Sequence, residues 1–215
     1  MSIRSASQTA LWATTAAMVL ISAAAWAGKS FVMPAAKPAA TYPAHDVHSN
    51  EGVAVALDPY DKPDKAGIFL IKYRELGFLP VLLVVTNDSD ETISLSDVKA
   101  EFVTADRTKI APADQDDIYR RVSHPSANAG RSPLPIPTKK VKGVVGAPEV
   151  EEMQNSRFAA KAIEPHSTHA GFLFFDVSGI PNPMAGANFY LNGVHDAKGN
   201  ELLYFEIPLD NPAKP

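Results

Sequence analysis

Residues 78–90 read FLPVLLVVTNDSD, an apolar run followed by a cluster of turn-forming side chains. A valine-rich run of this length predicts a β-strand, and the NDSD tetrapeptide at its end predicts a tight turn. Every position of residues 81–85 is apolar, and the same holds for residues 171–175. A strand with one face in water alternates apolar and polar residues. We therefore expect helices of this chain, or another protein chain, to cover the outer face of both strands.

Shorter segments that alternate apolar and polar residues lie on either side of this run. A series of short strands separated by turns is typical of an antiparallel β-sandwich. The composition agrees, because 46% of the residues are hydrophobic, 20% are charged, and the chain has 18 prolines and 12 glycines. Such a chain can bury a core, and its prolines and glycines favour turns over a helical bundle. We expect strands at residues 51–57, 67–73, 93–95, 98–103, 108–111, 168–177, 187–191 and 202–209.

Residues 112–164 break the strand pattern and predict an insertion that contains two helices. Pro112 and Asp114 favour the start of a short helix, with Asp114 and Asp117 as a partial capping box. A segment rich in proline and glycine follows at 124–148. Residues 149–161 then predict a second helix, acidic at its start as the helix dipole prefers. We expect the apolar side chains of both helices to cover the sandwich, namely Ile118, Tyr119, Val122, Val150, Met153 and Phe158.

The first 27 residues have the parts of a secretory signal peptide. Arg4 precedes an apolar stretch at 10–27 that ends Ala25-Trp26-Ala27, and small residues at the first and last of these positions mark a cleavage site. We predict a signal peptide at 1–27, cleaved before Gly28. The alternative is a retained membrane anchor, since about 18 such residues approach the length that spans a bilayer.

Both alternatives predict an extracytoplasmic location, periplasmic or secreted, and only the anchor predicts contact with a membrane. Residues 28–44 contain three prolines, which exclude a regular helix and predict a linker rich in proline and alanine. The exported domain is then expected at residues 45–211, with the insertion at 112–164.

Two stretches of the chain resemble bacterial extracytoplasmic immunoglobulin-like domains. Residues 80–95, PVLLVVTNDSDETISL, resemble the second and third strands of those domains, and residues 163–177, IEPHSTHAGFLFFDV, are similar to their later Gly-aromatic strand. Residues 188–191 and 204–209 fit their final strands. The resemblance covers residues 51–111 and 162–209. It implies an immunoglobulin-like antiparallel β-sandwich with a helix-containing insertion, in an envelope protein or secreted antigen, and it carries over no catalytic residue.

Several classes of chemistry are excluded by composition. The chain has no cysteine, which excludes disulfides, thiolate metal sites, a cysteine nucleophile and the lipid-anchored cysteine of envelope lipoproteins. Its net charge of −4 gives no global attraction to nucleic acid. Arg120-Arg121 and the lysines at 139, 140 and 142 form a local basic zone. This zone could contact an anionic polymer or a lipid head group, but it lacks the aromatic residues that stack on bases.

The densest group of metal-ligand side chains is His45-Asp46-Val47-His48. On an extended segment Asp46 and His48 share one side, where they could bind zinc if a further histidine came near. His166, Ser167, His169 and Asp176 hold the residue types of a catalytic triad, but they lack the Gly-x-Ser-x-Gly motif that exposes a nucleophile.

We therefore expect an exported, non-catalytic protein with no cofactor and no metal. It is expected to act by binding another envelope protein or an anionic polymer, and its binding residues cannot be named from the sequence. The alternative is a metal-dependent hydrolase that uses His45, Asp46 and His48. An enzyme would need at least three ligand-type side chains at one point of a pocket; the candidates are His45, Asp46, His48, His124, His166 and His169.

Overall fold

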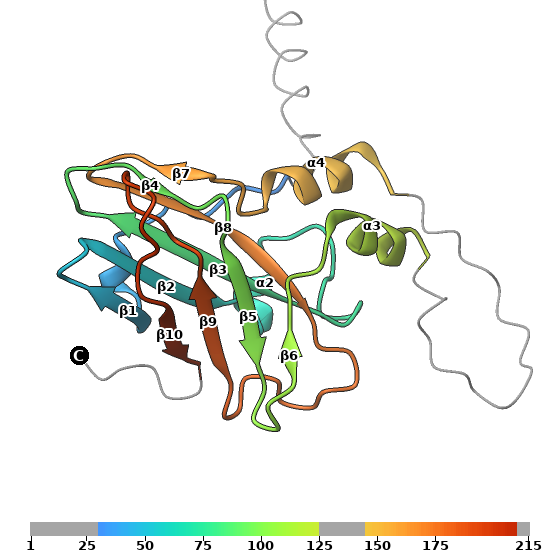
Figure 1. Ribbon diagram of the computed structural model, residues 1–215. Coiled ribbons are helices and arrows are strands. Elements are labelled where there is room, and N and C mark those ends of the chain that lie inside the picture. The colour runs from blue at the N-terminus through green and yellow to red at the C-terminus, as the bar shows by residue number, and fades with distance from the viewer. Residues whose placement is uncertain (1–29, 125–144, 210–215) are drawn as a thin grey trace, which may run out of the picture. The chain divides into compact units, whose positions relative to one another are not determined.

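Two four-stranded antiparallel sheets pack face to face in the computed structural model, which describes residues 30–124 and 145–209 (Figure 1). The chain divides into two compact units, Met1–Ser30 and Phe31–Pro215, and every element described below belongs to the second. The first sheet has the order β1 (Ala44–His48), β2 (Val53–Pro59), β3 (Phe78–Asn87) and β8 (Ser167–Asp176). The second has the order β10 (Phe205–Pro208), β9 (Asn188–Asn192), β5 (Lys99–Val103) and β6 (Lys109–Ile110). A short ribbon pairs β4 (Ile93–Ser94) with β7 (Ala162–Ile163).

The order of the strands along the chain is that of an immunoglobulin-like sandwich. β2, β3 and β8 lie side by side in one sheet, as strands A, B and E do, while β5, β9 and β10 lie in the other, as strands C, F and G do. β3 and β8 are paired over ten residues, from Phe78 opposite Asp176 to Asn87 opposite Ser167. The structure thus confirms the predicted all-β antiparallel sandwich with a helix-containing insertion.

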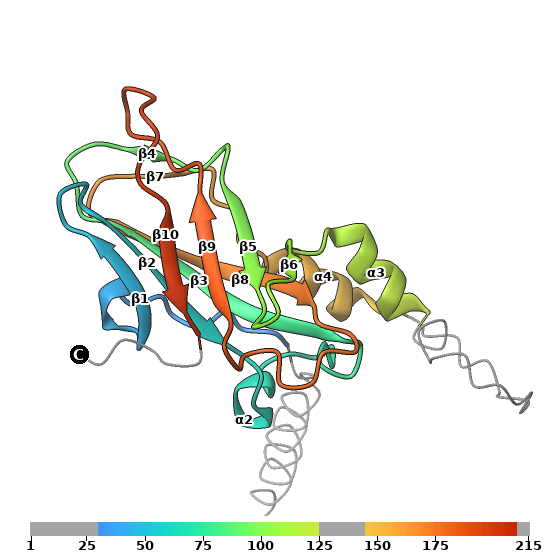
Figure 2. The ribbon, with the colours of Figure 1, turned by 60° about the horizontal axis from the view of Figure 1, so that its bottom comes forward.

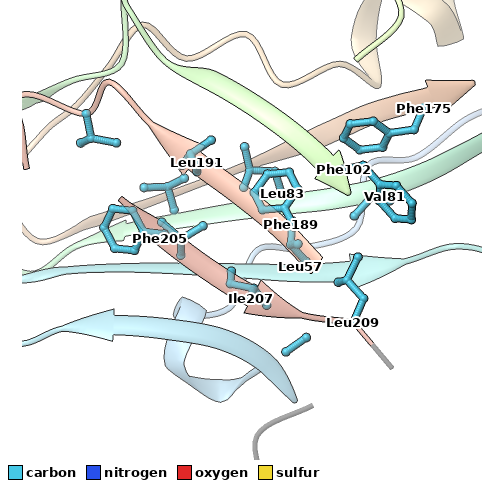
Figure 3. Packing of buried hydrophobic residues seen from close by; sticks show 14 of the residues in the cluster. Leu57, Val81, Leu83, Phe102, Phe175, Phe189, Leu191, Phe205, Ile207 and Leu209 are labelled. Carbon is cyan, nitrogen blue, oxygen red and sulfur yellow. The ribbon is translucent and has the colours of Figure 1, made fainter. Parts of the chain in front are cut away.

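The main core lies between the sheets. Figure 3 shows side chains from both sheets pointing into this space, among them Leu57, Val81 and Leu83 from the first sheet and Phe189, Phe205 and Ile207 from the second. Alternate residues of β3 face this core, and each large side chain buried there contributes about 1.5–3 kcal/mol.

A second core covers the outer face of the first sheet. All ten residues of β3 are buried, because Phe78, Leu82 and Val84 point away from the main core into this second one. The expectation that β3 and β8 need an outer cover is therefore confirmed. The covering side chains come from three separate segments: Phe31, Met33 and Ala39; Tyr60, Phe69, Ile71 and Tyr73; and Ile118, Val122, Val150 and Met153 of the insertion.

Two of these covering segments were expected to have other structures. Residues 67–73, predicted as a strand, form none; the ring of Phe69 packs edge-to-face on Phe172 of β8 at 4.9 Å. Residues 31–42 of the predicted linker pack on the sheet, with Phe31 stacked on Phe69 at 5.6 Å between ring centroids and Ala39 fully buried in the 3₁₀ helix η2 (Ala39–Thr41), while Ala44, the last residue of that linker, begins β1. The amide of Ala39 donates to the Thr86 hydroxyl at 2.8 Å. Apolar residues in these segments therefore cover the sheet without joining it.

The insertion begins with α3 (Gln115–Ser123), whose Asp114 cap accepts from the Asp117 amide at 2.7 Å, as the sequence predicts. Ile118 is buried as expected, whereas Tyr119 is 48% exposed and does not cover the sheet. The second helix of the insertion, α4 (Ala147–Asn155), ends before the predicted residue 161. Phe158, which was expected in this helix, packs against the main core. Residues 125–144, most of the predicted loop, lie outside the described residues. A further short helix, α2 (Pro63–Ala66), lies beyond β2 (Figure 2).

Helix α4 ends early because the chain after it pairs with the edge of β8. Phe172 donates its amide to Ser156 O at 2.7 Å and accepts from the Phe158 amide at 3.1 Å. This close approach depends on Gly171, since a Cβ there would lie 2.3 Å from Phe158 Cα. At the other end of the insertion, the Ala113 amide donates to Phe174 O at 2.7 Å. Both ends of the insertion thus cover the edge of β8, which would otherwise be open to pairing with another chain.

Candidate binding site

The His45–His48 segment forms β1, and its side chains alternate as the sequence predicts. His48 Nδ1 lies 2.9 Å from Glu51 Oε2 and its Nε2 lies 3.4 Å from Asp46 Oδ2. The ring of His48 stacks on Phe205 with centroids 4.0 Å apart. His45 is turned away and bonds Tyr42 O through Nδ1.

The same carboxylates also bond the backbone of β10 and of the residues just before it. Asp46 Oδ2 accepts from the Glu206 amide at 3.1 Å, and Glu51 Oε1 accepts from the Leu203 amide at 3.2 Å. These contacts join the two sheets along the side where β1 meets β10. Within residues 30–124 and 145–209, no group of three histidine or acidic side chains is placed to hold a metal ion. The described contacts of Asp46, His48 and Glu51 therefore serve the packing of the two sheets.

The triad residue types are far apart. Ser167 begins β8 and Asp176 ends it, so about 30 Å separates them at ~3.3 Å per residue. Ser167 Oγ donates to Glu164 O at 2.7 Å, and His166 Nε2 lies 3.1 Å from Asp90 Oδ1. Asp176 is therefore held at the opposite end of β8 from His166 and Ser167, although all three lie within a short stretch of the sequence.

Both arginines of the predicted basic zone are bonded within the domain. Arg121 forms an ion pair with Asp176, donates to Ser178 Oγ at 3.0 Å and to Leu76 O at 3.2 Å, and lies over the Phe78 ring at 4.4 Å. Hydrogen bonding from this guanidinium lowers the pKa of Asp176 to about 2. Arg120 pairs with Asp117. Arg121 therefore fastens α3 to the end of the first sheet, and the lysines at 139, 140 and 142 lie outside the described residues.

A buried acid, Glu152 of α4, was missed by sequence reasoning. Its side chain accepts from the amides of Leu70 and Ile71, and the residue is 1% exposed. Burial raises the pKa of Glu152, and burial together with the nearby Glu152 charge raises the pKa of Tyr73. Glu152 therefore holds residues 70–71 against the insertion. Its position among acidic neighbours on a helix gave no signal of burial.

The outer face of the second sheet carries the most exposed aromatic group of the described domain. We define this face by the residues that line one hollow of about 1,000 Å³, among them Glu101, Asn188, Tyr190, Asn192, Tyr204 and Glu206. Tyr204 is 57% exposed and its neighbour Leu203 is 69% exposed. The rings of Tyr190 and Tyr204 lie 6.3 Å apart, centroid to centroid. In Figure 1 the strands that carry this face, β10, β9 and β5, lie in front of the first sheet.

The polar groups of this outer face are largely paired with one another. Tyr190 Oη donates to Glu206 Oε1 at 2.6 Å, and Lys109 Nζ lies 2.8 Å from Glu101 Oε2. Three acids line the hollow (Glu101, Glu201 and Glu206) against two bases (Arg107 and Lys109), so the face is close to electrically balanced. The alternation in Phe189-Tyr190-Leu191 is the signal that separates Tyr190 from its buried neighbours.

No protein-family model matches this chain, and no curated protein matches it. The immunoglobulin-like extracytoplasmic family therefore remains a prediction from the residues quoted above. In the part of the chain that the structure describes, no helix has the length and apolar character needed to cross a membrane.

Proposed function

We propose that the protein is an exported, non-catalytic binding protein of the bacterial envelope, and that it binds a hydroxyl-rich polysaccharide on the outer face of the second sheet. The observation that carries this proposal is that the exposed ring of Tyr204 lies beside the half-buried ring of Tyr190 in one hollow with amide and carboxylate side chains. A tyrosine ring offers an apolar face to the C–H groups of a sugar. The amides of Asn188 and Asn192 both donate and accept, as sugar hydroxyls require.

Charge decides between kinds of polymer. The three acids and two bases of the hollow give no positive excess, so this face favours a neutral polysaccharide over the anionic polymer expected from the basic zone. The arginines of the basic zone also argue against an anionic polymer as ligand, because both form ion pairs within the domain.

The hydrolase alternative is disfavoured because, among the described residues, Asp46, His48 and Glu51 are not placed to hold a metal ion together. The His48 ring is held between two carboxylates and stacked on Phe205, and both carboxylates bond backbone amides in or just before β10. We expect elemental analysis to find no stoichiometric zinc. One zinc per chain that is lost on His48→Ala would favour the hydrolase.

Export is supported by the signal-peptide pattern of residues 1–27. The compact unit that carries the sandwich starts at Phe31, shortly after the predicted cleavage site.

Co-sedimentation of the purified protein with insoluble envelope and plant polysaccharides tests the binding face. Tyr204→Ala should weaken binding about tenfold, which is ~1.4 kcal/mol and within the range of an aromatic contact. Tyr119→Ala is the matched control, because Tyr119 is similarly exposed on α3 and should bind like the parent. Equal binding by both variants would overturn the proposed face. Capture of an envelope protein by the parent but not by Tyr204→Ala, with no polysaccharide bound, would replace the polymer by a protein partner.

A further inference from the structure

The two long sides of the sandwich differ. Where β1 meets β10, Asp46 and Glu51 bond the backbone across the two sheets. On the opposite side, between β5 and residues 157–161 of the insertion, lies a groove of about 780 Å³. This volume falls within the ~300–1,000 Å³ of small-molecule sites.

The floor of this groove is the main core itself. Leu83 of β3, a buried core residue, lies at the bottom. Partly buried side chains of the same core form the walls, namely Val98, Ala100, Phe158, Ala160 and Leu173. Covering apolar surface is favourable by ~25 cal/mol per Å², so the groove favours a ligand with an apolar chain.

Three cationic side chains line the same groove: Lys99, Arg157 and Lys161. Among the described residues, none of the three has an ion-pair partner. Arg157 donates only to the amide oxygen of Gln115, at 3.3 Å. Glu101, the one acid among the lining residues, is paired with Lys109 at 2.8 Å. In a chain of net charge −4, this unpaired positive group favours an anionic ligand.

We infer that this groove binds a long-chain carboxylate. The hydrocarbon chain lies against Leu83 and Leu173, and the carboxylate faces Lys99, Lys161 and Arg157. The apolar part of the groove fits the hydrocarbon chain, and the cations fit the carboxylate. Two compounds test these parts separately, because inorganic phosphate lacks the apolar chain and a neutral long-chain alcohol lacks the charge. The groove shares Glu101 with the hollow proposed to bind polysaccharide but contains neither Tyr190 nor Tyr204, so either proposal can fail alone.

Titration calorimetry of the full protein with dodecanoate, below its micelle-forming concentration, tests the inference. Dodecanoate should bind with one site per chain. Acetate, inorganic phosphate and dodecanol should each bind at least about tenfold more weakly. Raising the salt concentration should weaken the binding of dodecanoate, because the head group is held by exposed charges.

Two variants locate the site. Lys99→Gln/Lys161→Gln removes two exposed cations without altering the core and should weaken dodecanoate binding about tenfold or more. Lys37→Gln/Lys198→Gln carries the same change of net charge at exposed positions outside the groove and should bind like the parent. Ala160→Leu should narrow the groove from its apolar wall and weaken dodecanoate binding, with acetate unaffected.

The inference would be overturned if dodecanoate did not bind, if acetate or phosphate bound equally well, or if the two double variants lost dodecanoate affinity to the same extent. Equal affinity for dodecanol would show that the cations contribute nothing and would also overturn it.

Discussion

Replacing Gly171 by alanine should force the end of the insertion away from β8. A Cβ at this position would lie 2.3 Å from Phe158 Cα, 2.5 Å from Phe158 N and 2.8 Å from the carbonyl carbon of Arg157. All three are backbone atoms, so no side-chain rotation relieves the contact. The segment must shift, and its two hydrogen bonds with Phe172, at 2.7 and 3.1 Å, lengthen or break.

The expected cost follows from these contacts. Overpacking at a buried site costs about 1–3 kcal/mol and each lost backbone hydrogen bond about 0.5–1.5 kcal/mol, which together give about 2–6 kcal/mol. That is a large part of the ~5–15 kcal/mol that stabilises a domain. A loss of about 3 kcal/mol lowers the melting temperature of a domain of this size by roughly 6–12 °C.

Thermal unfolding followed by circular dichroism measures this effect. Gly67→Ala is the matched control, because Gly67 has φ −60° and its added Cβ would find its nearest neighbour at 3.3 Å. It should melt within a few degrees of the parent. If Gly171→Ala melts together with Gly67→Ala, the close approach of the insertion to β8 is not what fixes this glycine, and the reasoning is refuted.

Three further predictions concern titration and export. Pairing with Arg121 lowers the pKa of Asp176 to about 2 in the folded protein. The pairing therefore stabilises the fold at pH values above the ordinary pKa of an aspartate, and this stabilisation is lost as the pH falls through about 2. Acid unfolding curves of Asp176→Asn should not show this loss of stability. The pKa of Glu152 is raised in the folded protein, so its effect on stability runs in the opposite direction. Its contribution to the free energy of unfolding is present at low pH and is lost as the pH rises through the folded pKa. Urea titrations should show a smaller fall in unfolding free energy over that range for Glu152→Gln, and an unchanged slope would contradict the burial argument. Intact-mass measurement of protein from the envelope or medium should place the N-terminus at Gly28, whereas a mass that includes residues 1–27 would identify an anchor.

The central strands could be predicted because one local signal decided each of them. The apolar run at 78–86 has no stable place except between two cores, and β3 lies there. The Asp114 cap is equally local, since the residue and the amide that it accepts from are three positions apart.

Other elements could not be predicted because distant partners decide them. Residues 67–73 have the composition of a strand, but the edge-to-face packing of Phe69 on Phe172 uses them as a cover. The predicted helix at 149–161 stops at Asn155 because the edge of β8, far along the chain, offers hydrogen bonds to Ser156 and Phe158.

The candidate sites also divide into those that local sequence indicates and those that distant contacts bring together. The sequence identified His45, Asp46 and His48 by their density, and the structure uses Asp46 and His48 to join β1 to β10. Tyr190 and Tyr204 lie apart in the sequence and meet on the outer face only because β9 pairs with β10. Lys99 and Lys161 line one groove because the insertion returns along the side of the sandwich.

The pairing of both ends of the insertion with one strand edge has an evolutionary consequence. Pro112 and Ala113 leave the sandwich opposite Phe175 and Phe174, and Ser156 and Phe158 return opposite Phe172. The sandwich itself thus fixes both anchor points of the insertion. Doubling the length of a flexible loop costs about 0.6 kcal/mol, less than the loss of one buried methylene. We therefore expect changes of length between α3 and α4, with both helices and both anchor points kept, to alter the free energy of folding little, so that insertions and deletions there are tolerated.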